Sequence, residues 1–352
     1  MQHHSKKLIA VALASVTAMA AQADSKLIAN DPVPDKGVRA AAVEYIAEQI
    51  EERTDGSVTI EQNWNGALFK TDVALQSIGR GVADMGLVIG AYSAKELPEL
   101  QLAGLQLKPA HPWVMMQSMF ELMTTNEQVQ QRLNDLNIEY ISTFALSPGI
   151  LACSGQGIRA LTDVPGKKIA HIGTSAAIFG ELGGALVSMP IYDVRQSMET
   201  GLVECSLTFD DYAVASGLNE LIDTITDMHF SSLASLAIFM NKDAFNKLTP
   251  EEQAIIKQVG RDVMDVYGEN LTRAHVTAME TLTEGPDAAD YVELSAEDYA
   301  QIADLFKPSI ETWMSDATAV GIDGAALKAD FLAFIDKWTE IMEKDGLPWD
   351  RR

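Results

Sequence analysis

The order of hydrophobic and polar residues predicts alternating helices and strands in the first half of the chain. Residues 37–53 carry apolar side chains at helical spacing, and residues 58–64 alternate as a half-buried strand does. Residues 85–89 are continuously apolar, which is typical of a strand buried in a parallel sheet. Further helices are expected over 72–80, 109–123 and 126–136, and a further strand over 138–144. This order indicates a mainly parallel sheet with helices on both faces.

The second half repeats the pattern. Strands are expected over 168–172, 203–207 and 236–240, and helices over 174–186, 193–200, 295–306 and 324–342. Thr249 followed by Pro250 and then by Glu252 combines a capping residue, a proline at the first helical position and a glutamate three residues after the cap. These residues predict the start of a long helix that reaches Thr283.

A short internal repeat supports two similarly built halves. Residues 76–84 read QSIGRGVAD and residues 196–204 read QSMETGLVE, so each copy has a glycine between a helix end and a strand start. Glycine suits the left-handed conformation that ends many helices. The copies lie 120 residues apart, as expected of two lobes with a similar construction.

The amino terminus reads as an export signal. Lys6 and Lys7 precede an apolar run over residues 8–20, and Ala21-Gln22-Ala23 forms an A-x-A cleavage site. Cleavage would leave a chain that begins at Asp24, with about 330 residues, enough for two domains. The formal charge of -24 argues against nucleic acid or anionic lipid as a partner. We therefore expect a periplasmic protein that is not inserted in the membrane.

Residues with catalytic or metal-binding chemistry are sparse. The sequence contains no H-E-x-x-H, G-x-S-x-G or G-x-x-x-x-G-K-[ST] motif. Gly155, Gly157 and Ala160 fit G-x-G-x-x-A, but Pro165 falls where a nucleotide-binding helix would continue. The histidines lack the spacing of metal ligands, so neither a metal nor a cofactor is expected. Cys153 and Cys205 could pair in an oxidising compartment, yet we favour two buried thiols.

Several motifs in order resemble the solute-binding proteins of TRAP transporters, the DctP family. In the second half they read DVPGKKI at 163–169, LGGA at 182–185, SMP at 188–190 and VRQSMETGLVE at 194–204. In the first half they read TDG at 54–56, NGAL at 65–68 and GVADM at 81–85, and LTPEEQ at 248–253 matches the start of the family's long helix. The resemblance covers nearly all of the mature chain.

The resemblance implies an α/β fold of two lobes, the type II-like periplasmic binding fold, with mainly parallel sheets flanked by helices and a long helix spanning both lobes. We expect a signal peptide over 1–23, lobe I over 24–146 and lobe II over 147–234. A hinge-crossing strand, the spanning helix and C-terminal helices follow over 235–352. The solute would bind between the lobes, which close over it, and the loaded protein would dock on a separate membrane permease.

One departure from the family bears on the ligand. Members that bind organic acids usually have arginine after the Gly-x-Lys-Ile element, whereas Ala170 follows Ile169 here. A second arginine, frequent about twenty residues earlier in sialic-acid binders, is also missing, since that region reads Ser147-Pro148-Gly149-Ile150. The two-pronged hydrogen bonding of arginine to a ligand carboxylate is therefore unavailable at these positions.

Other side chains could line the site instead. The candidate cationic groups for a carboxylate are Arg159, Arg195, Lys70 and His171. The candidate acids for an ammonium group are Asp31, Asp210 and Asp211, and Thr208 lies where the family often supplies an asparagine. Aromatic rings that could wall the pocket by cation–π contact are Phe144, Tyr92, Trp64, Phe179 and Phe209.

These residues lead to a ranked set of functions. We expect a monomeric, non-enzymatic solute receptor for a small amine or zwitterion such as ethanolamine. A carboxylate held by a replacement cation such as Arg159 or Lys70 is the alternative. A secreted two-lobed enzyme would need a nucleophile–base or metal constellation, and a binding protein for an ATP-driven importer should lack the long helix begun at Pro250.

Overall fold

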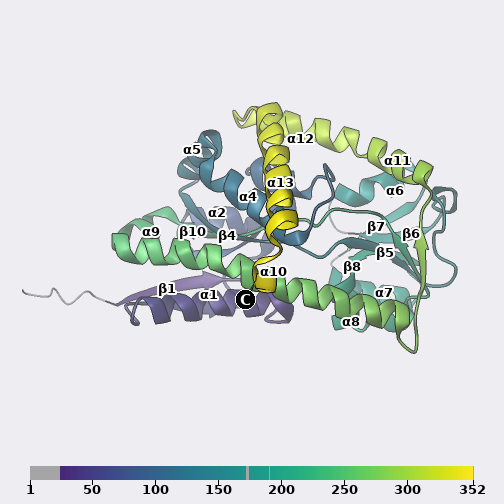
Figure 1. The fold of residues 1–352 in the computed structure, drawn as a ribbon, viewed down its shortest axis with the longest axis horizontal. Coiled ribbons are helices and arrows are strands. Elements are labelled where there is room, and N and C mark those ends of the chain that lie inside the picture. Colours follow the sequence, from purple (N-terminus) through teal and green to yellow (C-terminus); the bar gives the residue numbers. More distant parts are fainter. Residues whose placement is uncertain (1–23, 172–173, 190, 352) are drawn as a thin grey trace, which may run out of the picture.

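Two β-sheets organise the chain into two lobes (Figure 1). The computed structural model describes residues 24–171, 174–189 and 191–351, so the expected signal peptide over 1–23 lies outside the described residues. In lobe I the strand order is β2 (Val58–Asn63), β1 (Ser25–Asn30), β3 (Met85–Ile89), β10 (Leu236–Asn241) and β4 (Ile138–Phe144). Only β10 runs antiparallel to its neighbours.

The sheet of lobe II follows the same plan. Its strand order is β11 (Asp290–Glu293), β9 (Thr224–Asp227), β5 (Gly149–Cys153), β8 (Cys205–Phe209), β6 (Lys168–His171) and β7 (Ala185–Ser188). Here only β5 is antiparallel to its neighbours. Successive residues of β5 point to opposite faces: Leu151 and Cys153 enter one hydrophobic core, and Ile150 and Ala152 enter another. The predicted α/β class with mainly parallel sheets is confirmed.

Helices cover both sheets. The first lobe carries α1 (Gly37–Arg53), α2 (Ala74–Gly79), α3 (Pro98–Gln101), α4 (Pro112–Thr125), α5 (Glu127–Asp135) and α9 (Lys242–Lys247). The second carries α6 (Ala177–Glu181), α7 (Val194–Glu199) and α8 (Asp210–Ala215). The C-terminal part forms α10 (Pro250–Glu284), α11 (Ala296–Leu305), α12 (Lys307–Ala319) and α13 (Gly324–Asp345). Short 3₁₀ helices occupy Thr71–Val73, Gly90–Tyr92, Leu102–Gly104, Leu161–Asp163, Thr174–Ala176, Ile191–Asp193, Leu218–Leu221 and Pro348–Arg351.

The long helix α10 passes both lobes and covers the open edge of β4 (Figure 1). It begins as predicted, because the Thr249 hydroxyl accepts from the backbone N–H of Glu252 and the Glu252 carboxylate accepts from the N–H of Thr249. Lys257 donates to the carbonyl of Tyr140 at this edge. A Cβ at Gly260 would lie only 2.1 Å from the Ile141 carbonyl oxygen, so the close approach requires glycine. The helix thereby shields an edge that could otherwise pair with another chain.

The internal repeat has the same structure in both lobes. Gly81 and Gly201 have φ of 73° and 70°, and their N–H groups donate to the carbonyls of Ile78 and Met198, three residues earlier. Each copy is followed directly by a strand, β3 in one lobe and β8 in the other. The predicted construction of both copies is confirmed.

The prediction of a helix over 174–186 is wrong beyond residue 181, where α6 ends. Gly183 has φ of 85° and ends the turn after α6, and residues 185–188 form β7, which pairs with β6. A Cβ at Gly184 would lie 2.8 Å from the Phe179 carbonyl oxygen, so the two glycines allow a tight return that a continuing helix does not. Strands β1, β9 and β11 and helices α3, α8, α9 and α12 are additions to the predicted elements.

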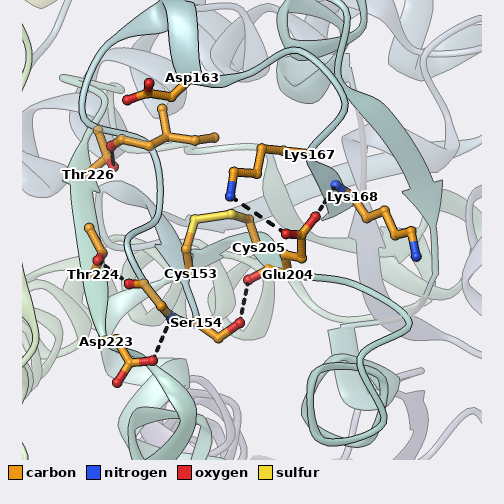
Figure 2. The surroundings of a disulfide bond; sticks show 12 residues. Cys153, Ser154, Asp163, Lys167, Lys168, Glu204, Cys205, Asp223, Thr224 and Thr226 are labelled. Atoms are coloured by element: carbon orange, nitrogen blue, oxygen red, sulfur yellow. Dashed lines mark hydrogen bonds and ion pairs between the residues drawn. A yellow bond between two sulfur atoms is a disulfide. The ribbon is translucent and has the colours of Figure 1, made fainter.

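The expectation of two buried thiols is also wrong. Cys153 and Cys205 form a disulfide between adjacent antiparallel strands, and both side chains are fully buried (Figure 2). The register places the two residues directly opposite each other, with their Cα atoms 4.0 Å apart. Beside the bond, the carboxylate of Glu204 forms an ion pair with Lys167 at 3.6 Å, and the Ser154 hydroxyl donates to the Glu204 carbonyl (Figure 2).

Candidate functional site

The chain topology brings the carboxyl ends of the parallel strands in one sheet to face those in the other sheet. In lobe I the parallel strands end at Asn30, Asn63, Ile89 and Phe144. A four-residue segment, 145–148, leads from β4 to the start of β5, and the segment 228–235 returns from the end of β9 to β10. Because β5 and β10 are the antiparallel strands, both segments join the carboxyl-end edge of one sheet to that of the other. Ligands of open α/β sheets bind at such edges, and we call this the interlobe region.

On the lobe I side, Asp31 directly follows β1 and is almost fully buried. One of its carboxylate oxygens accepts from the N–H of Val33 at 2.8 Å, and the other forms an ion pair with Arg39. Burial raises the pKa of Asp31 to about 6, although Arg39 opposes that shift. Arg39 comes from the first turn of α1, donates to the carbonyl of Pro34 at 2.6 Å and lies 5.7 Å from the ring centre of Trp64. Arg39 was not among the residues predicted from sequence.

On the lobe II side, two adjacent acids begin α8. Asp210 is fully buried, and its carboxylate bonds His275 of α10 and accepts from the N–H of Asp211. The bond to Asp210 raises the pKa of the His275 imidazole above its usual value. Asp211 accepts a hydrogen bond of 2.7 Å from the hydroxyl of Ser147, which belongs to the segment 145–148. Burial raises the pKa of Asp211.

Two further polar groups lie at the ends of the lobe II strands. Thr208 lies on β8 and its hydroxyl is buried. His171 is the last residue of β6, and its Nδ1 atom is also buried. Within the described residues neither group has a hydrogen-bond partner. Buried polar groups are normally paired. Phe209, the last residue of β8, is half-buried. These groups are therefore suited to hydrogen bonding with a bound molecule.

The remaining predicted site residues divide into two groups. Lys70 and Tyr92 follow the ends of β2 and β3 and are exposed; Lys70 donates to the Asn65 carbonyl at 3.1 Å. Phe144 and Phe179 are fully buried, so they support the lobes from within rather than walling a pocket. Phe144 packs on Tyr267 of α10, with ring centres 4.8 Å apart.

Two predicted cations form ion pairs with acids of lobe II. Arg159 forms an ion pair with Asp290, the first residue of β11, which places it at the edge of the sheet opposite the interlobe region. Arg195 pairs with Glu199 and Glu220. Arg159 is therefore at the amino-terminal ends of the strands, away from a ligand held between the lobes, whereas Arg195 is engaged by two acids within lobe II. Sequence alone did not reveal the register that sets these positions.

The residues that the structure describes contain no group of three or more histidine, cysteine, aspartate or glutamate side chains arranged to hold a metal ion. Among them, no helix combines the length and apolar character needed to cross a bilayer.

Two lobes with facing sheet edges, joined by crossing segments and a spanning helix, define a periplasmic-type solute-binding protein. The family model "bacterial extracellular solute-binding protein, family 7" (DctP) matches residues 30–316, and the chain belongs to this family of TRAP transporter solute-binding proteins. The family is one of solute receptors rather than enzymes, and it works in the periplasm.

Known relatives agree with this assignment. A solute-binding protein of Albidiferax ferrireducens is 24% identical over 283 residues, which is 78% of each chain. A TRAP periplasmic solute-binding protein from Desulfovibrio salexigens has the same fold, with a TM-score of 0.78, 22% identity and coverage of 92% of this chain and 98% of that one. A Bordetella bronchiseptica protein with bound mandelate has a TM-score of 0.75, 20% identity and coverage of 89% and 99%.

Proposed function

We propose that this protein captures a small polar organic solute in the interlobe region and delivers it to the membrane permease of a TRAP transporter. The observation that carries this proposal is that the carboxyl ends of the strands of both sheets meet, with unpartnered polar atoms of Thr208 and His171 on the lobe II side. A solute could bond groups from both lobes at once, and the gain would favour the closed arrangement. The protein spends this binding energy on closure and performs no chemistry on its ligand.

We also propose the processing and organisation that the sequence predicts. Residues 1–23 would be removed on export. The lobes would divide near residues 146 and 234, where the two crossing segments lie, and the C-terminal part would start at 235. The receptor would act as a monomer.

For the ligand, the proposal favours a small amine or zwitterion, such as ethanolamine. Ala170 stands where acid-binding members of the family have arginine. The two cationic groups that reach the interlobe region from α1 and α10, Arg39 and His275, already bond Asp31 and Asp210. A carboxylate would therefore meet no unpaired buried cation among the described residues, and burying an unpaired charge is costly.

A small carboxylate is the second candidate, and the solved relatives favour it. The Bordetella bronchiseptica protein holds mandelate, and a Bordetella pertussis receptor with a TM-score of 0.75 and 18% identity binds pyroglutamic acid. In this chain an acid would need Lys70 or His171 as its partner. Lys70 is exposed and His171 is half-buried, so closure of the lobes would have to bring them to the ligand.

A thermal-shift screen distinguishes the two ligand classes. Ethanolamine at a concentration 100 times its Kd should stabilise the protein by about 2.7 kcal/mol, because a ligand that binds only the folded state shifts unfolding by mass action. Pyroglutamate and mandelate serve as the acidic comparison compounds. Strong stabilisation by either acid, with none by ethanolamine, would contradict the amine proposal and favour the carboxylate.

A further inference from the structure

The segment that returns from lobe II to lobe I changes its partners at Ser231 and Ser232. Phe230, just before them, is buried in a hydrophobic core of lobe II. Ala234, two residues after them, is buried in the core of lobe I, and its carbonyl accepts from the hydroxyl of Thr143 on β4 at 3.1 Å. The two serines therefore lie at the middle of the crossing, within the interlobe region.

Lobe I holds this point of the segment through Gln106, which lies between the 3₁₀ helix Leu102–Gly104 and α4. The Oε1 atom of Gln106 accepts from the backbone N–H of Ser231 at 2.6 Å. Because a backbone N–H requires an acceptor, this bond fixes which end of the side-chain amide faces Ser231 and assigns the other end as the NH₂ group. One carbon atom joins the two ends, so the Nε2 atom also lies beside the crossing segment.

The Nε2 atom of Gln106 is buried, and it has no hydrogen-bond partner among the residues that the structure describes. The same is true of the hydroxyl of Ser232, a residue with 0% exposure. A buried polar group that is left unpaired costs free energy, so such groups are normally satisfied. An amide NH₂ group can only donate. A molecule that satisfies Gln106 must therefore present an acceptor atom to the crossing segment.

This donor complements the unpartnered groups of the opposite lobe. Thr208 and His171 lie at the ends of β8 and β6, and each has a buried polar atom that no described residue bonds. A solute between the lobes could accept from Gln106 on one side and bond Thr208 on the other. Closure of the lobes would then complete both bonds, and the gain would favour the closed arrangement.

We propose that Gln106 selects among small amines by donating from Nε2 to an oxygen atom of the solute. This inference rests on the proposed solute capture and deepens it, since it names one residue and the chemical group that it recognises. Ser231 is the positioning residue, because its N–H orients the amide. Hydroxylated amines bind well, whereas simple alkylamines are rejected, because an alkylamine leaves the NH₂ group buried and unpaired.

The test removes the oxygen from the solute and the NH₂ group from the protein in turn. Ethylamine is ethanolamine without its hydroxyl group, and Gln106→Met removes the amide while keeping the length of the side chain. Gln301→Met makes the same change at an exposed position on α11 and is the matched control. Calorimetric titration of both amines into the full chain and both variants completes a double-mutant cycle. Circular dichroism checks the fold, and Gln106→Leu is the substitute if Gln106→Met does not fold.

The unaltered chain and Gln301→Met should bind ethanolamine about 10-fold more tightly than ethylamine, the difference expected for one buried hydrogen bond. Gln106→Met should lose this preference, because it has no NH₂ group to leave unpaired. A residue that only held Ser231 in place would behave differently, since its loss would weaken both amines alike and keep the preference.

A preference for ethanolamine that persists in Gln106→Met would overturn the role of Gln106 while leaving solute capture intact. Equal affinities of the unaltered chain for the two amines, or no binding of ethanolamine, would also overturn it. The wider proposal of solute capture fails only if the chain binds no small solute, pyroglutamate and mandelate included.

Discussion

Replacing Cys153 and Cys205 together with alanine should lower the free energy of unfolding of lobe II by about 4 kcal/mol, as expected for a bond closing a loop of this length. The disulfide links strands whose cysteines are 52 residues apart in sequence. The intervening chain contains β6, β7 and their helices, so the bond restricts about half of lobe II in the unfolded state. It also lies at the edge of the sheet away from the interlobe region, so ligand affinity should change little.

Urea unfolding followed by circular dichroism, with and without a reducing agent, measures this effect. The oxidised chain should unfold at a clearly higher urea concentration than the double variant, and the reductant should shift only the unaltered chain. Alkylation of the unfolded, unreduced chain should modify no cysteine. Two modified cysteines there, or equal midpoints for the variant and the oxidised chain, would contradict this account of the bond.

Replacing Glu99 with glutamine should stabilise the protein by about 3 kcal/mol above pH 7 and have almost no effect below pH 4.5. The size follows from the difference between the pKa of Glu99 in the folded chain and its pKa in the unfolded chain, which burial imposes. Glu99 is fully buried in α3, and within the described chain neither carboxylate oxygen has a hydrogen-bond partner. Burial raises its pKa to about 7, with the charge of Arg132 opposing the shift. The unfolded chain therefore loses this proton at a lower pH than the folded chain does.

The sign of the effect follows from that difference. Below pH 4.5 Glu99 is protonated in both states and behaves much as glutamine would. As the pH rises towards 7, the folded state must either keep its proton or bury a charge, so the unaltered chain loses stability that the variant keeps.

Urea midpoints of the two chains over pH 4 to 8 measure the difference, and Glu311→Gln, an exposed position on α12, is the matched control. A difference between Glu99→Gln and the unaltered chain that does not change with pH would contradict the assigned burial.

Local periodicity predicted most of the elements. Residues 37–53 and 138–144 became α1 and β4 with the expected bounds, because each has a clear helical or strand pattern with a defined end. The capping residues before α10 were likewise sufficient to place its start. The repeat around Gly81 and Gly201 showed in advance that the two lobes share a construction.

What the sequence could not supply was the register between distant segments. The cysteines face each other only because β5 and β8 pair antiparallel with residue 153 opposite residue 205, and no local pattern fixes that alignment. The same reason explains Arg159, which was a candidate cation for a ligand carboxylate but pairs with Asp290 at the start of β11. Strand β7 was read as helix because only the glycines at 183 and 184 mark the change.

The charged residues of the site include some that the sequence could indicate and some that depend on long-range packing. Asp31 and Asp210 were identified from sequence as candidate acids, yet their partners Arg39 and His275 come from helices elsewhere in the chain. The sequence could have indicated the pair of Asp31 and Arg39, since Arg39 lies eight residues after Asp31 at a predicted helix start. It could not indicate the pair of Asp210 and His275, because these residues are 65 positions apart and only the packing of α10 on α8 brings them together.

The central claim is that one small organic solute occupies the interlobe region. A crystal structure of the chain purified from the periplasm with the solute it carries tests this most directly. The account predicts density for one small molecule between the sheet edges, in contact with Thr208 and His171 and enclosed by both lobes. A solute bound on the outer surface of one lobe, or contacts confined to residues away from these strand ends, would contradict it.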